Sequence, residues 1–486
     1  MSIDINYVFL APELVVLVGG LMVLLFDLYF WRDKNVPLAV LTIATLLIAA
    51  GLTLWISGEE GTTAANMLIV DPMSIFFKMV ILVSTILIVM LSINYIDQLK
   101  TVSLGEYYAL ILFASAGAMY MAATADLIML YIALELTSLG SYILAGYRKF
   151  DPKSNEAILK YFLLGLIASA MMLYGFSFIY GFTGHTQLAS ISSSLTAPGS
   201  QVVSSVNFAM MAGVILALVA FYFKIAAVPF HQWVPDVYEG APTPITAYLS
   251  VIPKAAAFAV MARLLYVGFP AFVDQWKILF IVLSIMTMFV GNLAALLQTN
   301  IKRLLGYSSI AHAGYIIMGF AVVSERALSG ILVYVALYIF FNIGAFAIVT
   351  ALSDSGNSDT LEDYNGLAKR SPFLALTMFI FLIALAGLPP TAGFWGKALI
   401  FWAAIEGGLW WLAVIGLINT VISIYYYINI ARHMYIVEPA AAEDIKTPSM
   451  FRAVIWITVI GTVLFGVLPG TIIEISKTVV KGFGAL

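Results

Sequence analysis

Residues 372–404 decide the class of fold, and they read PFLALTMFIFLIALAGLPPTAGFWGKALIFWAA. The stretch is apolar apart from one lysine, Lys397. As a straight helix it would be roughly 50 Å long, whereas the hydrocarbon core of a bilayer is about 30 Å thick. Near its middle stands GLPPTAG (387–393), and the paired prolines Pro389 and Pro390 break a helix. We therefore expect a membrane-crossing helix that is broken near its centre.

The composition of the whole chain agrees with a membrane protein. Of 486 residues, 62% are hydrophobic and only 10% are charged, whereas soluble domains carry about 25% charged residues. The net charge of −3 gives no reason to expect nucleic acid as a partner. The chain has no cysteine, which excludes disulfides, iron–sulfur ligation and thiolate catalysis. Its four scattered histidines do not indicate a metal site.

Apolar runs of about 20 residues predict fourteen membrane spans. The connections between them are short, and we expect the longest polar one, residues 184–206, to be a surface loop. No soluble domain fits between the spans, so any redox cofactor must be in another chain. The predicted spans are 8–30, 36–56, 74–95, 106–124, 127–147, 156–181, 207–229, 244–268, 277–298, 302–322, 328–352, 372–404, 409–435 and 450–470.

Lysine and arginine divide unevenly between the connections, which predicts the orientation in the membrane. Odd-numbered connections hold thirteen of these residues and even-numbered ones only two, Lys277 and Arg326. We expect the odd connections to be cytoplasmic and, with an even number of spans, both termini to lie outside. Beyond the last span, residues 472–481 resemble a short helix in the membrane interface. The thirteen are Arg32, Lys34, Lys100, Arg148, Lys149, Lys153, Lys302, Arg303, Lys369, Arg370, Arg432, Lys446 and Arg452.

A second segment has the character of 372–404. Residues 207–240 are again too long for one span, and Pro229 and Pro235 follow Lys224. If spans 4–8 and 9–13 are two copies of one unit, the break falls in the fourth helix of each copy. A unit of five helices requires the second copy to be inverted. We therefore predict a peripheral segment (1–105), two five-helix repeats (106–270 and 271–436), and a C-terminal span with an interfacial tail (437–486).

Five titratable residues lie near the centres of predicted spans. They are Glu135, Lys224, Lys254, His312 and Lys397. A charge at that depth costs several kcal/mol, so each is a candidate for function. Desolvation lowers the pKa of a lysine and a nearby carboxylate raises it again, so such groups are suited to carrying protons. A static Lys–Glu clamp between helices is the alternative. We expect Lys78, Lys160 and Arg263, which lie close to span ends, to snorkel to the surface.

Several stretches resemble the antiporter-like subunits of respiratory complex I, the proton-pumping NADH:quinone oxidoreductase. They are PFHQWVPDVYEGAPTP (229–244), LSVIPKAA (249–256), NIKRLLGYSSIAH (300–312) and GLPPTAGFWGK (387–397). The second part of the first stretch, DVYEGAPTP, is similar to the subunit N group of that family. The resemblance covers essentially the whole chain.

The resemblance implies a polytopic all-helical subunit with fourteen spans and an inverted repeat. It implies that Glu135, Lys224, Lys254, His312 and Lys397 translocate protons, with no cofactor or metal in this chain. FMN, iron–sulfur clusters and quinone are expected in partner subunits, and the partners are the neighbouring antiporter-like and small membrane subunits. The implied location is a bacterial inner membrane. The alternatives are a subunit of a sodium/proton antiporter or membrane-bound hydrogenase, or a scaffold that conducts nothing.

Overall fold

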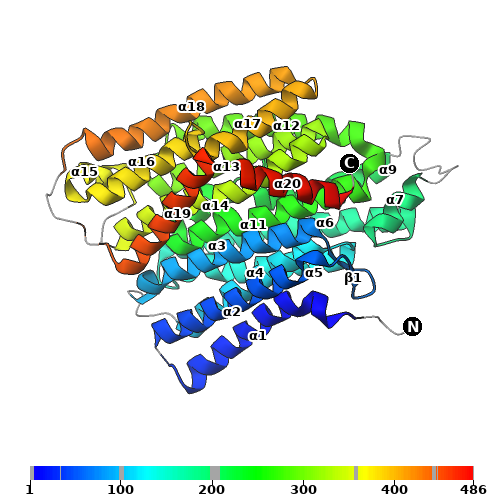
Figure 1. Ribbon diagram of the computed structural model, residues 1–486, viewed down its shortest axis with the longest axis horizontal. Helices are drawn as coiled ribbons and strands as arrows, with labels where there is room; N and C mark the ends of the chain where they lie inside the picture. Colours follow the sequence, from blue (N-terminus) through cyan, green and yellow to red (C-terminus); the bar gives the residue numbers. More distant parts are fainter. Residues whose placement is uncertain are drawn as a thin grey trace.

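The apolar stretches of the sequence form long helices in the computed structural model (Figure 1). The structure describes residues 5–32, 34–97, 103–196, 208–354, 359–439, 445 and 447–484. Lys100 and Lys446, used above for orientation, lie outside these residues, as do both terminal residues. One short antiparallel hairpin, β1 (Gly61–Thr63) and β2 (Leu68–Val70), accompanies the helices.

Within the described residues, twelve helices are long and apolar enough to cross a membrane. The other two predicted spans are occupied by α4 (Leu104–Ala123) and by the broken pair α16 (Pro372–Ala386) and α17 (Ala392–Glu406). The predicted all-helical membrane fold is therefore confirmed. The twelve are α1 (Tyr7–Tyr29), α2 (Asn35–Trp55), α3 (Pro72–Asp97), α5 (Leu127–Ala145), α6 (Pro152–Thr183), α9 (Phe208–Ile225), α11 (Thr243–Arg263), α12 (Val273–Ala295), α13 (Ile301–Val322), α14 (Glu325–Asp354), α18 (Trp410–Tyr435) and α19 (Ser449–Val467).

Shorter elements lie between these helices or follow them. There are four short helices among the described residues: α7 (Leu188–Thr196), α10 (Trp233–Gly240), α15 (Leu367–Arg370) and α20 (Gly470–Phe483). Single turns of helix are found at η1 (Ile56–Gly58), η2 (Leu264–Gly268), η3 (Pro270–Phe272) and η4 (Leu361–Tyr364).

The helices are arranged so that three of them form the interior. The pair α1 and α2 lies at one edge of the bundle and α18 at the opposite edge (Figure 1). The most apolar stretch of α11 is entirely buried, and those of α13 and α14 are 94% buried. Polar residues within these buried stretches therefore face protein and not lipid.

Capping residues in the sequence set where several helices begin. The Asp126 carboxylate accepts hydrogen bonds from the backbone N–H groups of Ile128 and Met129 at the start of α5. Asn300 does the same for the first turn of α13, and Asp151 precedes a proline at the first position of α6. Such side chains satisfy N–H groups that have no partner within the helix.

Both broken passages have the same local backbone. The first break separates α9 from α10 and the second separates α16 from α17. Ala226 and Gly387 have positive φ angles of 62° and 80°, and each stands three residues before a proline, Pro229 or Pro390. The peptide bonds Val228–Pro229 and Pro389–Pro390 are both cis. The helix axis is thus interrupted at the same kind of turn in two places far apart in the sequence.

The expected surface loop at 184–206 is wrong for part of its length. Residues 188–196 form α7, whose buried side chains Leu188, Ile191 and Leu195 follow a helical spacing. Of the serines between them, only Ser193 is exposed, and the others are half-buried. These serines gave the segment its loop-like composition. Residues 197–206 lie outside the described residues.

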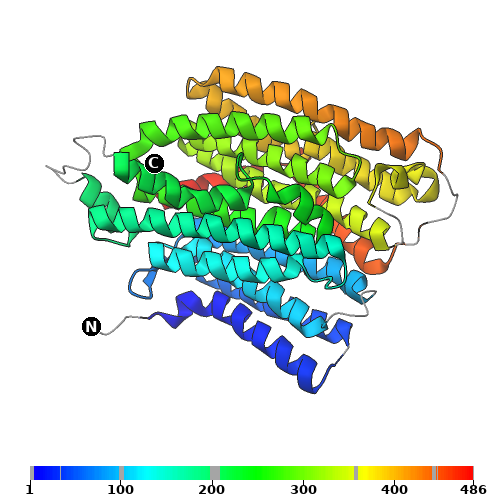
Figure 2. The same ribbon diagram turned by 180° about the vertical axis from the view of Figure 1, so that it is seen from behind.

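The described ends of the chain lie at one end of the bundle. The start of α1 and the end of α20 are both on the right in Figure 1 and on the left in the reversed view of Figure 2. The tail is helical as expected, and Ile472, Ser476, Val479 and Val480 form its buried face. That face packs against α14 and α3.

Two of the three residues expected to snorkel are instead buried in ion pairs. The Lys78 amine lies 2.7 Å from the Glu13 carboxylate, and both side chains are 1% exposed. Arg263 donates two hydrogen bonds to Asp71, at 2.8 and 3.0 Å. Burial alone would raise the pKa of Asp71, but the Arg263 guanidinium holds that pKa below its usual value. Lys160 is 41% exposed, as expected for a residue near a span end.

Candidate functional site

The five candidate residues come from five different helices, and four of them are buried. Lys224, Lys254, His312 and Lys397 are at most 5% exposed. Glu135 is half-buried on α5. All five were singled out because charge is costly inside a membrane. The structure shows what each side chain contacts.

Glu135 and Lys224 are not in direct contact, contrary to the close pairing that the clamp alternative requires. The Glu135 carboxylate accepts a hydrogen bond from the hydroxyl of Ser169 on α6. No ion pair within 4 Å joins it to Lys224, which is also a described residue. Any influence of Glu135 on Lys224 therefore acts across intervening side chains.

The Lys224 amine lies in an aromatic cage at the end of α9. It is 5.0 Å from the ring centroid of Tyr161 and 5.1 Å from that of Tyr142. It donates one hydrogen bond, to the Tyr161 hydroxyl at 3.3 Å. Tyr161 in turn stacks on Trp233, the first residue of α10, with ring centroids 4.4 Å apart. The second half of the broken passage thus forms part of the surroundings of Lys224.

Lys254, at the centre of α11, is hydrogen-bonded to a single residue of α13. Its amine donates to the backbone carbonyl of Ser309 at 3.0 Å and to the hydroxyl of Ser309 at 2.5 Å. The same hydroxyl lies 3.2 Å from the hydroxyl of Tyr238 on α10. Lys254, Ser309 and Tyr238 therefore form one continuous set of hydrogen-bonding groups.

His312 lies one helical turn beyond Ser309, next to Lys254. Both line a cavity of about 10 Å³, the size of a single water molecule. The Nδ1 atom of His312 is 2.6 Å from the hydroxyl of Tyr334, and Nε2 is 3.3 Å from that of Tyr427. Both ring nitrogens therefore have partners that either donate or accept.

Lys397 is bound by the helix break itself. Its amine donates to the carbonyls of Ala386, at 2.9 Å, and Leu385, at 3.3 Å. These are carbonyls that α16 would bond internally if it continued past Gly387. The amine also lies 4.6 Å from the ring centroid of Tyr315. Lys397 lines a cavity of about 380 Å³ between α17 and α18.

Several polar partners were not foreseen from the sequence. Ser308 and Tyr315, four residues before and three residues after His312, bind residues of α12 and α18: Tyr427 bonds Ser308 at 2.5 Å, and Asn292 bonds Tyr315 at 3.3 Å. Asn292 also donates to Asn419 of α18 at 3.1 Å. In the sequence, only the asparagines within apolar stretches and the run of three tyrosines at 425–427 could have indicated these partners.

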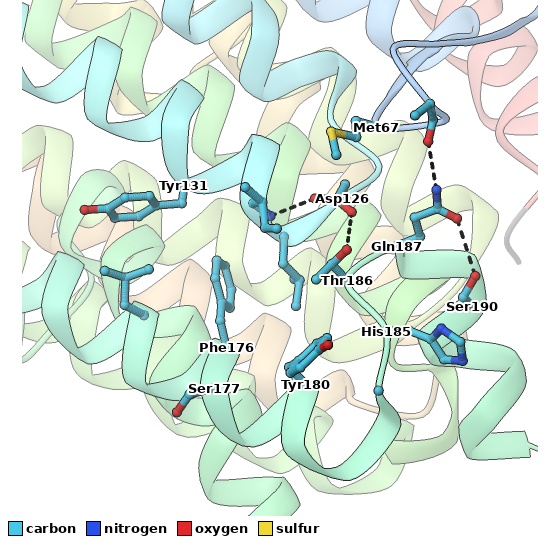
Figure 3. A pocket seen from close by; sticks show the side chains of 15 residues that line it. Met67, Asp126, Tyr131, Phe176, Ser177, Tyr180, His185, Thr186, Gln187 and Ser190 are labelled. Carbon is cyan, nitrogen blue, oxygen red and sulfur yellow. Dashed lines mark hydrogen bonds between the residues drawn. The ribbon is translucent and has the colours of Figure 1, made fainter. Parts of the chain in front are cut away.

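A larger cavity lies elsewhere, where α5 begins and α6 ends, and measures about 770 Å³ (Figure 3). Its charged residue, Asp126, caps α5 and accepts a hydrogen bond from Thr186 at 2.6 Å. Gln187 donates to the backbone of Ala65 at 2.9 Å. Tyr131, Phe176 and Tyr180 line the remainder (Figure 3). Asp126 and Thr186 are bonded to each other and Gln187 to the backbone, and none of the five candidate residues lines this cavity.

In the part of the chain that the structure describes, no cluster of three or more histidine, aspartate or glutamate residues is placed to hold a metal ion.

Comparisons with known proteins agree with this arrangement. Residues 123–423 match the family model described as NADH:quinone oxidoreductase/Mrp antiporter, TM. The chain is 42% identical to NADH-quinone oxidoreductase subunit N of Trichlorobacter lovleyi over 484 residues, which cover 98% of this chain and 97% of that protein. A chain of respiratory complex I from Thermus thermophilus superposes with a TM-score of 0.80 at 31% identity, covering 95% of this chain and 98% of that one. A chain of an Mrp complex from a Dietzia species has a TM-score of 0.85 at 21% identity, covering 97% and 96%, which shows the shared fold alone.

Proposed function

Because the chain belongs to the NADH:quinone oxidoreductase/Mrp antiporter membrane-subunit family and is similar to subunit N over its whole length, we propose that Lys224, Lys254 and Lys397 carry protons across the membrane. It is a multi-pass membrane subunit of NADH:quinone oxidoreductase, complex I. Proton translocation by this chain is coupled to electron transfer from NADH to quinone in partner subunits.

The observation that carries the proposal is the contrast between two kinds of buried lysine. Lys78 and Lys302 are as deeply buried as the candidates, and each pairs with a carboxylate at 2.7 Å. Among the described residues, Lys224, Lys254 and Lys397 have no carboxylate within 4 Å, and their partners are hydroxyls and carbonyls.

A buried cation without a counter-ion is costly, which favours release of its proton, whereas a paired cation is retained. The paired lysines have the features of a static clamp, and the unpaired ones have those of a proton path. The scaffold alternative accounts for the first group only.

We place a proton route from Lys224 through Lys254 and His312 to Lys397, with Glu135 acting on Lys224 from α5. Along the central part of this route, the hydroxyls of Ser309 and Tyr334 are neutral hydrogen-bonding groups, and the cavity beside Lys254 and His312 has room for one water molecule. The predicted division into segments 1–105, 106–270, 271–436 and 437–486 stays part of this proposal. It is supported by the matching turns at Ala226 and Gly387.

We propose that both termini face the outer, periplasmic side of a bacterial inner membrane, on the charge asymmetry of the connections. A protease-sensitive tag inserted after Lys369 should be cleaved only from the cytoplasmic side, and a tag at the N-terminus only from the outside. Cleavage of the tag at Lys369 from the outside would show that the proposed orientation in the membrane is wrong.

The cofactors are proposed to be in partner subunits, with FMN and iron–sulfur clusters accepting electrons from NADH and quinone bound at another chain. The neighbours of this chain in the membrane are other antiporter-like and small membrane subunits. The lipid bilayer surrounds the remaining faces.

Replacing Lys254 with methionine should reduce proton pumping by about tenfold or more, because a proton carrier contributes factors of that order or greater. The measurement is proton uptake during NADH oxidation by assembled complex in proteoliposomes. Lys149→Met, at an exposed position, is the matched control and should pump normally. The isolated chain should oxidise no NADH. Normal pumping by the Lys254 variant would contradict the proposal.

A further inference from the structure

The short helix α10 contacts the surroundings of both Lys224 and Lys254. Its first residue, Trp233, stacks on Tyr161, whose hydroxyl accepts the hydrogen bond of Lys224. Less than two turns later, Tyr238 bonds Ser309, which holds the amine of Lys254. Any displacement of α10 therefore alters the polar surroundings of both lysines together.

The covalent connection of α10 to α9 is not a continuous helix. Residues 226–232 form the break between them, and the indole N–H of Trp233 donates to the carbonyl of Phe223 across it at 2.9 Å. Since backbone hydrogen bonds do not fix the two halves to one another, the position of α10 depends on its side-chain contacts.

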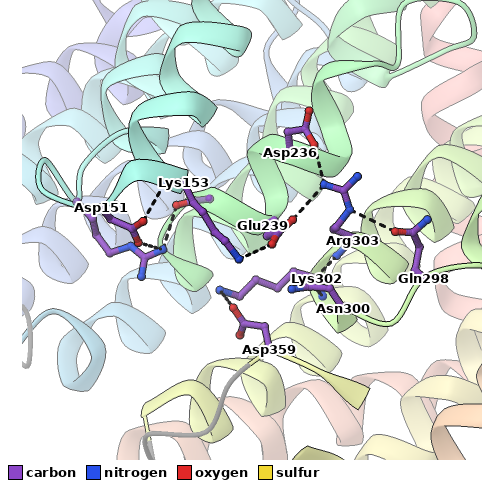
Figure 4. A network of polar contacts seen from close by, with 11 residues as sticks. Asp151, Lys153, Asp236, Glu239, Gln298, Asn300, Lys302, Arg303 and Asp359 are labelled. Carbon is purple, nitrogen blue, oxygen red and sulfur yellow. Dashed lines mark hydrogen bonds and ion pairs between the residues drawn. The ribbon is translucent and has the colours of Figure 1, made fainter. Parts of the chain in front are cut away.

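These contacts include an ionic cluster (Figure 4). It lies at the end of the bundle that the proposed topology places inside, which we call the inner end. One nitrogen of Arg303, at the start of α13, lies 2.6 Å from the Asp236 carboxylate and 3.0 Å from the Glu239 carboxylate. On the α6 side, Lys153 pairs with Glu239 at 2.7 Å, and Lys160 pairs with Asp236.

The two acidic residues of α10 are thereby held between α6 of the first proposed repeat and α13 of the second. Arg148 adds a hydrogen bond to the carbonyl of Gly240 at 3.1 Å. On the other side, Arg303 is oriented by Gln298, which accepts from its Nε at 3.3 Å (Figure 4).

The charges of this cluster are maintained at neutral pH. Burial would raise the pKa of Asp236, but Lys160 and Arg303 hold that pKa below its usual value. Burial would likewise raise the pKa of Glu239, and Lys153 and Arg303 lower it. Both carboxylates are therefore ionised, and Arg303, 28% exposed, remains within reach of water.

We propose that α10 is a coupling element, and that Arg303 is the positioning residue that sets, through Asp236 and Glu239, the relative arrangement of the Lys224 and Lys254 sites. The inference rests on the proposed function. Arg303 touches neither lysine, and the ion pairs that it forms are with α10. A change of charge at the inner end of the bundle is in this way transmitted to proton transfer between the two lysines.

The test replaces Arg303 with glutamine and with lysine in assembled complex, and measures protons pumped per NADH oxidised. Arg303→Gln should lower that ratio about tenfold while the amount of assembled complex stays within about twofold, because a small displacement of positioned groups costs at least this much. Arg303→Lys keeps the charge and should restore most of the ratio.

Tyr238→Phe removes only the hydroxyl that bonds Ser309 and should lower the same ratio. The matched control is Lys369→Gln, which removes a lysine with an exposed, 3.9 Å contact to Glu438 and should have no effect. A wild-type ratio for Arg303→Gln, or no rescue by lysine, would overturn the inference. If Lys254→Met still abolishes pumping in that case, the proposed function stands and only the role of α10 is refuted.

Discussion

Replacing Lys224 with arginine should abolish proton pumping, with a loss of at least about tenfold, although the positive charge is kept. The guanidinium does not release a proton in the working range of the enzyme. The cage also provides one hydrogen-bond acceptor, the Tyr161 hydroxyl, whereas an arginine side chain has five N–H donors. The measurement is proton uptake and quinone-dependent NADH oxidation by assembled complex.

The clamp alternative predicts the opposite result for this variant. Arginine interacts favourably with aromatic faces, and Tyr142 and Tyr161 both lie about 5 Å from the amine. If Lys224 were only a fixed cation holding helices together, arginine would be tolerated and methionine would not. An active Lys224→Arg complex would therefore refute proton loading at this residue.

The variant Glu135→Gln distinguishes the role of Glu135 from that of Lys224. The carboxylate bonds Ser169 and does not touch Lys224, so we expect a smaller loss of pumping than for Lys224→Arg. Glu135→Asp keeps the charge and should retain more activity than the glutamine variant.

The helical class and the two breaks could be predicted because they depend on local chemistry. Apolar runs set the spans, and prolines at 229, 389 and 390 interrupt them wherever the rest of the chain lies. The candidate residues could be chosen for the same reason, since the cost of a charge depends mainly on its depth.

Contacts between distant helices could not be predicted in this way. Lys78 lies near a span end, so depth alone favoured snorkelling, and only the folded structure brings the Glu13 carboxylate of α1 to the amine of Lys78. Tyr427, which bonds His312, is 115 residues away from it. The α10 cluster likewise joins residues of α6, α10 and α13 that no linear pattern connects.

Replacing Gly387 with alanine should reduce pumping about as strongly as removing the charge of Lys397, because a Cβ atom at Gly387 would lie 2.7 Å from Cδ and 3.2 Å from Nζ of that lysine. The amine would be displaced from the Ala386 carbonyl, which it contacts at 2.9 Å. The positive φ of 80° adds a cost of about 1 kcal/mol for alanine. We expect a loss of pumping of about tenfold or more, with little loss of assembled complex.

The corresponding turn in the other break supplies a control that distinguishes displacement of the Lys397 amine from backbone strain at the turn. Ala226 already has a φ of 62°, so this chain tolerates a Cβ atom in a left-handed turn before a proline. Ala226→Gly relieves about 1 kcal/mol of backbone strain and should pump normally. If Gly387→Ala lowers thermal stability slightly but leaves pumping intact, Lys397 does not need its place at the break. If Ala226→Gly is the variant that loses pumping, the two turns are not equivalent, and the proposed repeat loses its main support.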